Sequence, residues 1–188
     1  MISLIKRYLA LALVLGMSAI AQAQPNLIPG DAAPASFGST VNGTEVRVEN
    51  LTGKIVVATF WASWCAPCRQ ELSVLARIRK AVSASNMEIV AINYGEERQT
   101  FVQASKKLRE TGLTITHDRN FRLSRPLGIK GIPYMLIIDP SGKIKHIHQG
   151  FGDQSLGSLV DEINAMLQQQ HDDALQGTGD KSPTTPVN

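Results

Sequence analysis

The chain contains very little cysteine: two residues among 188, Cys65 and Cys68. A disulfide between them would close so short a loop that it would remove little entropy from the unfolded chain, so the pair is a poor structural staple. A zinc site needs four ligands and the chain has no second cysteine pair, which disfavours a zinc finger. Four histidines are present, none of them with finger-like spacing: His117, His146, His148 and His171. A reactive cysteine pair is therefore the favoured interpretation.

The sequence also lacks an excess of charge of either sign. Lysine and arginine total 19 against 16 aspartate and glutamate residues, and Lys6 and Arg7 near the amino end supply two of the basic charges. No basic run is present, so the charge pattern does not indicate a nucleic-acid partner. There is no glycine-rich phosphate loop and no haem-attachment motif, and we expect neither a cofactor nor a metal site.

The amino end carries the chain's apolar run, Tyr8–Ala21, which is short for a membrane span of roughly 20 residues. Two basic residues precede this run, and the small-x-small site Ala21-Gln22-Ala23 follows it. This three-part pattern predicts a signal peptide over residues 1–23, cleaved after Ala23. An uncleaved leader that anchors the protein to the inner membrane is the alternative. We expect a protein outside the cytosol, most simply in a bacterial periplasm.

The remaining chain divides into three parts. Residues 24–36 are rich in proline, alanine and glycine and are expected to form an extended lead-in. Residues 37–170 are long enough for one domain with its own core. Residues 171–188 are polar and without periodicity, which predicts a disordered tail.

Apolar patterning within the domain predicts alternating strands and helices. Continuous apolar runs and one shorter strand are expected at 54–61, 87–94, 113–117 and 133–139. Helical spacing is found at 67–83, 97–110 and 156–167, and a short helical segment is expected at 120–127. An Asn42-Gly43 pair predicts an N-terminal hairpin over 39–49, and a turn at 140–143 leads to an antiparallel strand over 144–151. The order predicts an α/β fold with a central mixed sheet, helices on both faces and an N-terminal β-hairpin extension.

The cysteine pair lies between a predicted buried strand and the start of a predicted helix. The N–H groups at a helix start carry partial positive charge, which favours a thiolate there, and the thiolate is the nucleophile. Pro67 is tolerated at this early helical position because its missing N–H would have had no partner. Cys65 is therefore the expected nucleophile, and Cys68 the thiol that resolves a mixed disulfide.

The segment Phe60-Trp61-Ala62-Ser63-Trp64-Cys65-Ala66-Pro67-Cys68 resembles the active-site motif of the thioredoxin superfamily. More narrowly, it is similar to the extracytoplasmic thiol–disulfide oxidoreductases of the TlpA and ResA type, including the cytochrome c maturation reductases. Gly53-Lys54 and the segment 128–133 add to the likeness, which covers roughly residues 30–168. The resemblance implies a thioredoxin-like fold for residues 37–170 and a redox disulfide between Cys65 and Cys68.

The same resemblance implies roles for residues outside the cysteine pair. Pro133 matches a cis-proline that faces the cysteines, which would leave the backbone of Ile132 free to pair with an extended substrate segment. Trp61 is expected to support the motif from below. Trp64 is expected to be exposed beside Cys65, where it can contact partners.

One departure from thioredoxins proper concerns the acid beneath the cysteines. Thioredoxins carry a buried aspartate in the preceding strand, where this chain has Thr59. Helical spacing places Glu71 on the row of Leu75, Ile78 and Val82, so its carboxyl group should be buried with a raised pKa. The TlpA and ResA type also has a glutamate here, which implies a role in thiol proton transfer. The alternative is a glutamate that stabilises the helix dipole.

The residues between the cysteines, Ala66 and Pro67, are uncharged. An adjacent cation would stabilise the reduced thiolate and favour an oxidant, so its absence favours a reductant. We expect a monomeric periplasmic enzyme that reduces disulfides in partner proteins, with a membrane thiol reductase as electron donor. Apocytochrome c is among the substrates that the resemblance implies.

Two alternatives remain from the sequence. Two soft thiolates and a histidine suit Cu(I), so a Cu(I)-binding metallochaperone on the same fold is one. An oxidative folding catalyst is the other, and only the reduction potential separates it from a reductase. A further observation is that His146 and His148 alternate on a strand and share a face, where a solvated pair is expected in preference to a metal pair.

Overall fold

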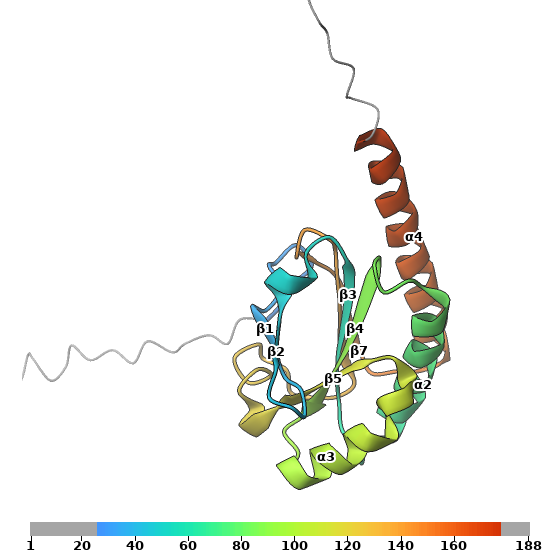
Figure 1. The fold of residues 1–188 in the computed structure, drawn as a ribbon. Coiled ribbons are helices and arrows are strands. Elements are labelled where there is room, and N and C mark those ends of the chain that lie inside the picture. The colour runs from blue at the N-terminus through green and yellow to red at the C-terminus, as the bar shows by residue number, and fades with distance from the viewer. Residues whose placement is uncertain (1–25, 178–188) are drawn as a thin grey trace, which may run out of the picture.

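The computed structural model describes residues 26–177 (Figure 1). The predicted signal peptide, residues 1–23, and the last eleven residues, 178–188, lie outside the described part of the chain. Within it, seven strands form one sheet in the order β2-β1-β5-β4-β3-β6-β7. None of the helices in this part is both long enough and apolar enough to cross a membrane.

Five strands make the core of the sheet. β3 (Ile55–Trp61), β4 (Met87–Tyr94) and β5 (Thr114–Asp118) run parallel, while β6 (Tyr134–Ile138) is antiparallel to β3 and β7 (Ile144–Gln149) to β6. Every residue of β3 is buried, as its continuous apolar run predicts for a central strand covered on both faces. The mixed sheet and its strands are confirmed, with shifts of one or two residues at the ends.

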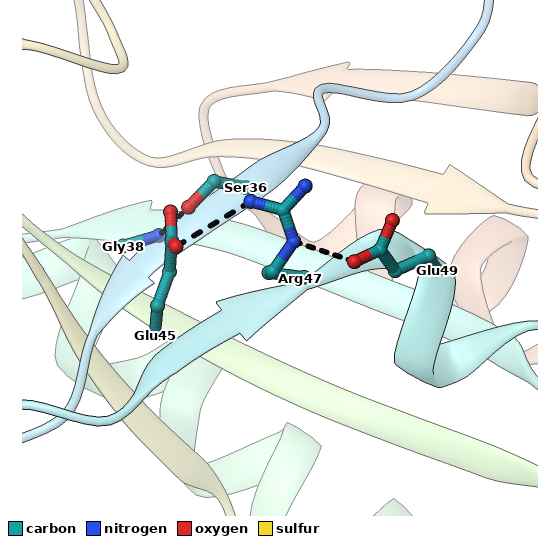
Figure 2. A network of polar contacts seen from close by, with 5 residues as sticks. All are labelled: Ser36, Gly38, Glu45, Arg47 and Glu49. Carbon is teal, nitrogen blue, oxygen red and sulfur yellow. Dashed lines mark hydrogen bonds and ion pairs between the residues drawn. The ribbon is translucent and has the colours of Figure 1, made fainter.

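The N-terminal hairpin extends the β5 edge of the sheet. β1 (Ser36–Ser39) pairs with β2 (Glu45–Arg47) and, through Ser39, with His117 of β5. Figure 2 shows how Arg47 joins β2 to the 3-10 helix η1 (Val48–Leu51): its Nε lies 2.7 Å from Glu49 Oε1, and its Nη1 lies 3.5 Å from Glu45 Oε2. The hydrogen bond and charge of Arg47 lower the pKa of Glu49. Exposed ion pairs of this kind contribute little to stability.

Three α-helices pack against one face of the sheet: α2 (Ala66–Ala81), α3 (Arg98–Lys107) and α4 (Asp153–Gly177) (Figure 1). All three contribute to the same apolar core, which is centred on alternate residues of β3 and β4. The opposite core contains no residue from these helices; residues of the lead-in, η1 and the segment 123–132 cover it instead. Helical cover on that second face is thus limited to short 3-10 turns.

Two predicted helices differ from the structure. Over 120–127 only the 3-10 helix η3 (Arg119–Phe121) forms, because Asn120 and Phe121 have φ of 58° and 59° and a right-handed helix cannot pass through them. The predicted helix 97–110 ends at Lys107, and a separate 3-10 helix, η2 (Arg109–Thr111), follows.

The closing helix is longer than predicted. α4 continues to Gly177, so residues 171–177 are helical, although the sequence predicted a disordered tail from 171. No glycine or proline interrupts the chain between Gly157 and Gly177, and alanine, leucine and glutamine in its last turns favour helix. A hydrogen bond of 2.9 Å from Gln168 Nε2 to Asp172 Oδ1 spans one turn at this end.

The attachment of the hairpin gives a stability prediction. A Cβ at Gly38 would lie 2.7 Å from the backbone oxygen of His117, whereas a Cβ at Gly43 would meet nothing within 4 Å. Both glycines have positive φ, near 86°, so alanine at either position carries a similar backbone cost of about 1 kcal/mol. We expect Gly38→Ala to lower the free energy of unfolding by about 2 kcal/mol more than Gly43→Ala, because β1 must also move away from β5. Urea denaturation of the two oxidised variants measures this difference, and equal losses would contradict it.

Candidate active site

The cysteine pair lies where the central strand β3 passes into helix α2. Cys65 is the N-cap of α2, with extended backbone angles, and its Sγ accepts a hydrogen bond of 3.3 Å from the backbone N–H of Cys68. Pro67 occupies the first turn, as predicted. The Sγ atom of Cys65 therefore lies at the positive end of the helix dipole, which favours negative charge on that sulfur after reduction.

Cys65 and Cys68 form a disulfide in this structure, with an S–S distance of 2.03 Å and a Cα–Cα distance of 5.3 Å. The two sulfurs differ in accessibility: Cys65 is 4% exposed and Cys68 is fully buried. Trp64, beside Cys65, is 67% exposed, which is unusual for so large an apolar side chain. A partner that approaches this surface contacts Trp64 and Cys65 first, because Cys68 is fully buried.

The proline loop lies against the cysteine pair. The Ile132–Pro133 peptide bond is cis, as predicted, and the backbone oxygen of Ile132 lies 3.9 Å from Cys65 Sγ. The pairing of Phe60 with Tyr134 in neighbouring strands fixes this approach, because the loop before β6 must then end next to the carboxyl end of β3. The structure thus brings Ile132 and Pro133 to Cys65, from a position 67 residues away in the chain.

Glu71 is buried beneath the cysteines. It is 1% exposed, and its Oε1 accepts a hydrogen bond of 2.5 Å from the hydroxyl of Thr59, which is fully buried in β3. Burial raises the pKa of Glu71 to about 7, and the hydrogen bond from Thr59 opposes part of that rise. The sequence identified Thr59 as the position where thioredoxins have an acid; the structure shows in addition that its hydroxyl donates a hydrogen bond to Glu71.

A second carboxylate, Glu96, was missed by the sequence analysis. Its Oε2 accepts hydrogen bonds from the backbone N–H of Ser63, at 2.9 Å, and from Asn93 Nδ2, at 2.6 Å, while its Oε1 accepts from the Ser63 hydroxyl at 2.6 Å. Glu96 thereby ties the loop before Cys65 to the end of β4. The signal that was available is that Asn93 lies near the carboxyl end of the strand next to β3 and Glu96 follows that strand, at the same edge of the sheet.

The two histidines of β7 are partly exposed, and both also contact an acidic side chain. His148 Nε2 lies 2.7 Å from Glu162 Oε2 of α4, and His146 Nδ1 lies 3.5 Å from Glu162 Oε1. They contact the closing helix because β7 lies beneath it. Within residues 26–177, no three histidine, cysteine or acidic side chains are grouped closely enough to hold a metal ion.

Residues 29–147 match the AhpC/TSA family. The chain belongs to this family. The thiol-disulfide oxidoreductase ResA of Geobacillus thermodenitrificans is 32% identical over 123 residues, 64% of this chain and 69% of the relative. The thiol:disulfide interchange protein HelX of Rhodobacter capsulatus is 29% identical over 88% of this chain and 89% of its own length.

Solved structures of similar proteins show which fold this chain has. A crystal structure described as a thiol:disulfide interchange protein DsbE from Chlorobium tepidum is similar with a TM-score of 0.67 and 31% identity, covering 76% of this chain and 99% of the other. The fold is therefore thioredoxin-like, as the sequence resemblance implied. Together with the Cys65–Cys68 pair, these relatives show that the chain is an enzyme, a thiol–disulfide oxidoreductase.

The raised pKa of Glu71 gives a prediction about stability and pH. Because the pKa is about 7 in the folded protein and 4.5 ordinarily, the folded state holds a proton that the unfolded state has lost between these values. Stability contributed by the protonated carboxyl is thus full below pH 4.5 and declines as pH rises towards 7. We expect Glu71→Gln to remove this decline and to be more stable than the unaltered protein at pH 8, by up to about 3 kcal/mol.

Denaturant unfolding of the oxidised proteins at several pH values between 5 and 8 measures this effect. Glu110→Gln is the matched control, because Glu110 is an exposed glutamate on the same face of the sheet. Its variant should follow the pH dependence of the unaltered protein. If the free energy of unfolding of Glu71→Gln varies with pH in the same way as that of the unaltered protein, burial does not hold a proton on Glu71.

Proposed function

We propose that this protein reduces disulfides in partner proteins outside the cytosol, with Cys65 as the attacking thiol and Cys68 as the resolving thiol. The observation that carries the proposal is the unequal placement of the two sulfurs: Cys65 at the helix start, beside Ile132 and exposed Trp64, and Cys68 fully buried behind it. A partner's sulfur has access to the first and not to the second.

The reaction balances over two electrons and two protons. The Cys65 thiolate of the reduced protein attacks a partner disulfide, forming a mixed disulfide and releasing one partner thiolate, which takes up a proton. Cys68 then loses its proton and attacks Cys65 Sγ, which closes the Cys65–Cys68 disulfide and releases the second partner thiol. The protein has given up two electrons, and an external dithiol must restore them.

Glu71 is proposed as the group that takes the proton from Cys68. The two residues are three positions apart on α2, so their side chains are neighbours on one face of the helix, and both are buried from water. Bulk water therefore cannot serve as the base at this depth. A carboxyl group with a pKa of about 7 can both accept and return a proton near neutral pH, as thiol exchange in either direction requires.

The direction of electron flow is proposed from charge. Neither residue between the cysteines is charged, and two carboxyl groups, Glu71 and Glu96, accept hydrogen bonds from Thr59 and Ser63 in the segment that leads to the pair. Negative charge near a thiolate disfavours the reduced anionic form relative to the neutral disulfide. A pair whose disulfide is favoured gives its electrons away readily, which makes it a reductant.

The partners and the compartment are also proposals. Strand addition at the backbone of Ile132 would hold an extended protein segment beside Cys65, with Trp64 as a contact. The predicted leader supports a periplasmic location, and the oxidoreductases that this chain resembles in sequence include cytochrome c maturation reductases, so apocytochrome c is the first substrate to test. A membrane thiol reductase is the proposed electron donor, and the protein is proposed to act as a monomer without a cofactor.

Trapping tests the assignment of the two cysteines. In Cys68→Ser the mixed disulfide cannot be resolved, so we expect partner proteins to remain attached to Cys65 and to be recovered under non-reducing conditions. In Cys65→Ser the remaining thiol is buried, so we expect at least tenfold less trapped partner, on the basis of accessibility. If Cys65→Ser traps partners and Cys68→Ser does not, the nucleophile is Cys68 and the proposal is wrong.

The pH profile of alkylation tests Glu71. We expect Glu71→Gln to retain the fold and to change the pH dependence of the reaction of reduced Cys65 and Cys68 with iodoacetamide, because one titrating neighbour has been removed. Glu110→Gln, on the exposed surface, should leave the profile unchanged. A profile in Glu71→Gln that superimposes on that of the unaltered protein would end the proton-transfer role.

A further inference from the structure

A cleft of about 350 Å³ lies between α2 and α3, and the charged side chains that line it are all cationic. Its apolar lining comes from Trp61, Leu72, Ala104 and Leu108. Two cations, Arg69 and Lys107, also line it, together with several hydroxyl groups and no carboxylate. A surface with an apolar floor and charge of one sign selects a ligand that combines an apolar body with negative charge.

The two cations are not neutralised by the protein itself. Arg69 Nη1 donates a hydrogen bond of 2.9 Å to the backbone oxygen of Ser63, which orients the guanidinium at the start of α2. In the part of the chain that the structure describes, neither Arg69 nor Lys107 forms an ion pair with an acidic side chain. Their charges therefore act on whatever enters the cleft.

The cleft adjoins the cysteine pair on the side away from the proline loop. Trp61 and Ser63 line it, and they precede Cys65 by four and two residues. In the sheet, β4, which leads to α3, lies on one side of β3, and β6, which follows Ile132, lies on the other. A partner chain joined to Cys65 would thus have the Ile132 backbone on one side of its cysteine and this cleft on the other.

We propose that the cleft binds an acidic segment of the partner protein, one that carries an apolar side chain and one or two carboxylates within about five residues of the partner's reactive cysteine. The apolar side chain packs on the partly exposed Leu108, next to the buried Trp61 and Leu72, and the carboxylates face Arg69 and Lys107. This inference rests on the proposed function, because it describes how the partner of that reaction is selected. Exposed charge pairs affect the alignment of the two chains and the association rate more than the affinity. This suits a partner that must dissociate after its disulfide has been reduced.

Two synthetic peptides with an intramolecular disulfide test the proposal. They differ only in one flank, Phe-Glu-Glu in the first and Phe-Gln-Gln in the second, placed two to five residues from the cysteine. We expect the reduced protein to react with the acidic peptide about threefold faster at low ionic strength, as exposed ion pairs allow. The preference should shrink at 0.15 M salt, where the Debye length is about 8 Å.

Charge reversal separates recognition from damage to the fold. Lys107→Glu should abolish the preference, because the new carboxylate offsets the charge of Arg69, and a merely structural defect would slow both peptides alike. Lys106→Glu is the matched control: Lys106 is the adjacent exposed lysine of α3 and does not line the cleft, so its variant should keep the original preference. Equal rates for the two peptides with the unaltered protein, or an unchanged preference in Lys107→Glu, would overturn the proposal.

Binding without turnover distinguishes failure of the cleft from failure of the reaction. A linear Phe-Glu-Glu peptide that has no cysteine should shift the indole N–H resonance of Trp61 in the oxidised protein, and the Phe-Gln-Gln peptide should shift it less. If the protein reduces neither disulfide peptide but the linear acidic peptide still shifts the Trp61 resonance, the proposed reductase function is wrong and the proposed binding in the cleft is supported. If the acidic peptide leaves Trp61 unshifted, the cleft proposal is wrong whatever the reaction rates are.

Discussion

The buried hydrogen bond between Thr59 and Glu71 is the contact on which the geometry of this site depends. It joins the middle of the central strand to the first turns of α2, both at less than 2% exposure. A carboxyl group at this depth has no water to solvate its charge, so it is stable only as a protonated acid or with a strong donor beside it. The Thr59 hydroxyl is that donor. The contact thus joins α2 to the central strand and opposes part of the rise in pKa that burial gives Glu71.

The loop between β3 and α2 has a second constraint from Glu96. Three donors, two from Ser63 and one from Asn93, converge on this one carboxylate, and it comes from the end of the neighbouring strand. Backbone N–H groups next to a helix start have few partners of their own, so a fixed acceptor there holds the chain in one conformation. With Glu71 below α2 and Glu96 beside the loop, Cys65 is positioned by two side chains that do not themselves exchange electrons.

Much of this arrangement could be predicted from the sequence because it depends on local patterns. Continuous apolar runs predicted β3, β4 and β6, and the spacing of Leu75, Ile78 and Val82 predicted that Glu71 faces the core. The position of the cysteines between a strand and a helix followed from the same patterns. The resemblance added the proline loop, which no local pattern could place beside Cys65 across 67 residues.

The features that were missed depend on contacts between distant segments or on single backbone angles. Glu96 is an ordinary polar residue in a loop, and only the pairing of β3 with β4 brings it to Ser63. The predicted helix over 120–127 failed because Asn120 and Phe121 adopt left-handed angles, which composition does not reveal. The end of α4 was misjudged for a different reason: its last residues are mostly polar, a pattern shared by disordered tails and by helices that extend beyond the core into solvent.

The position of Glu71 also shows why stability and reactivity oppose each other here. An apolar residue of similar size would pack beneath α2 without the desolvation of a carboxyl group, and the fold would then be more stable above pH 7. In the proposed reaction, however, the thiol of Cys68 would then have no acceptor for its proton, because Cys68 is fully buried. The proposed reaction therefore requires an internal base beside Cys68. On this proposal, the stability lost by burying Glu71 follows from the burial of Cys68.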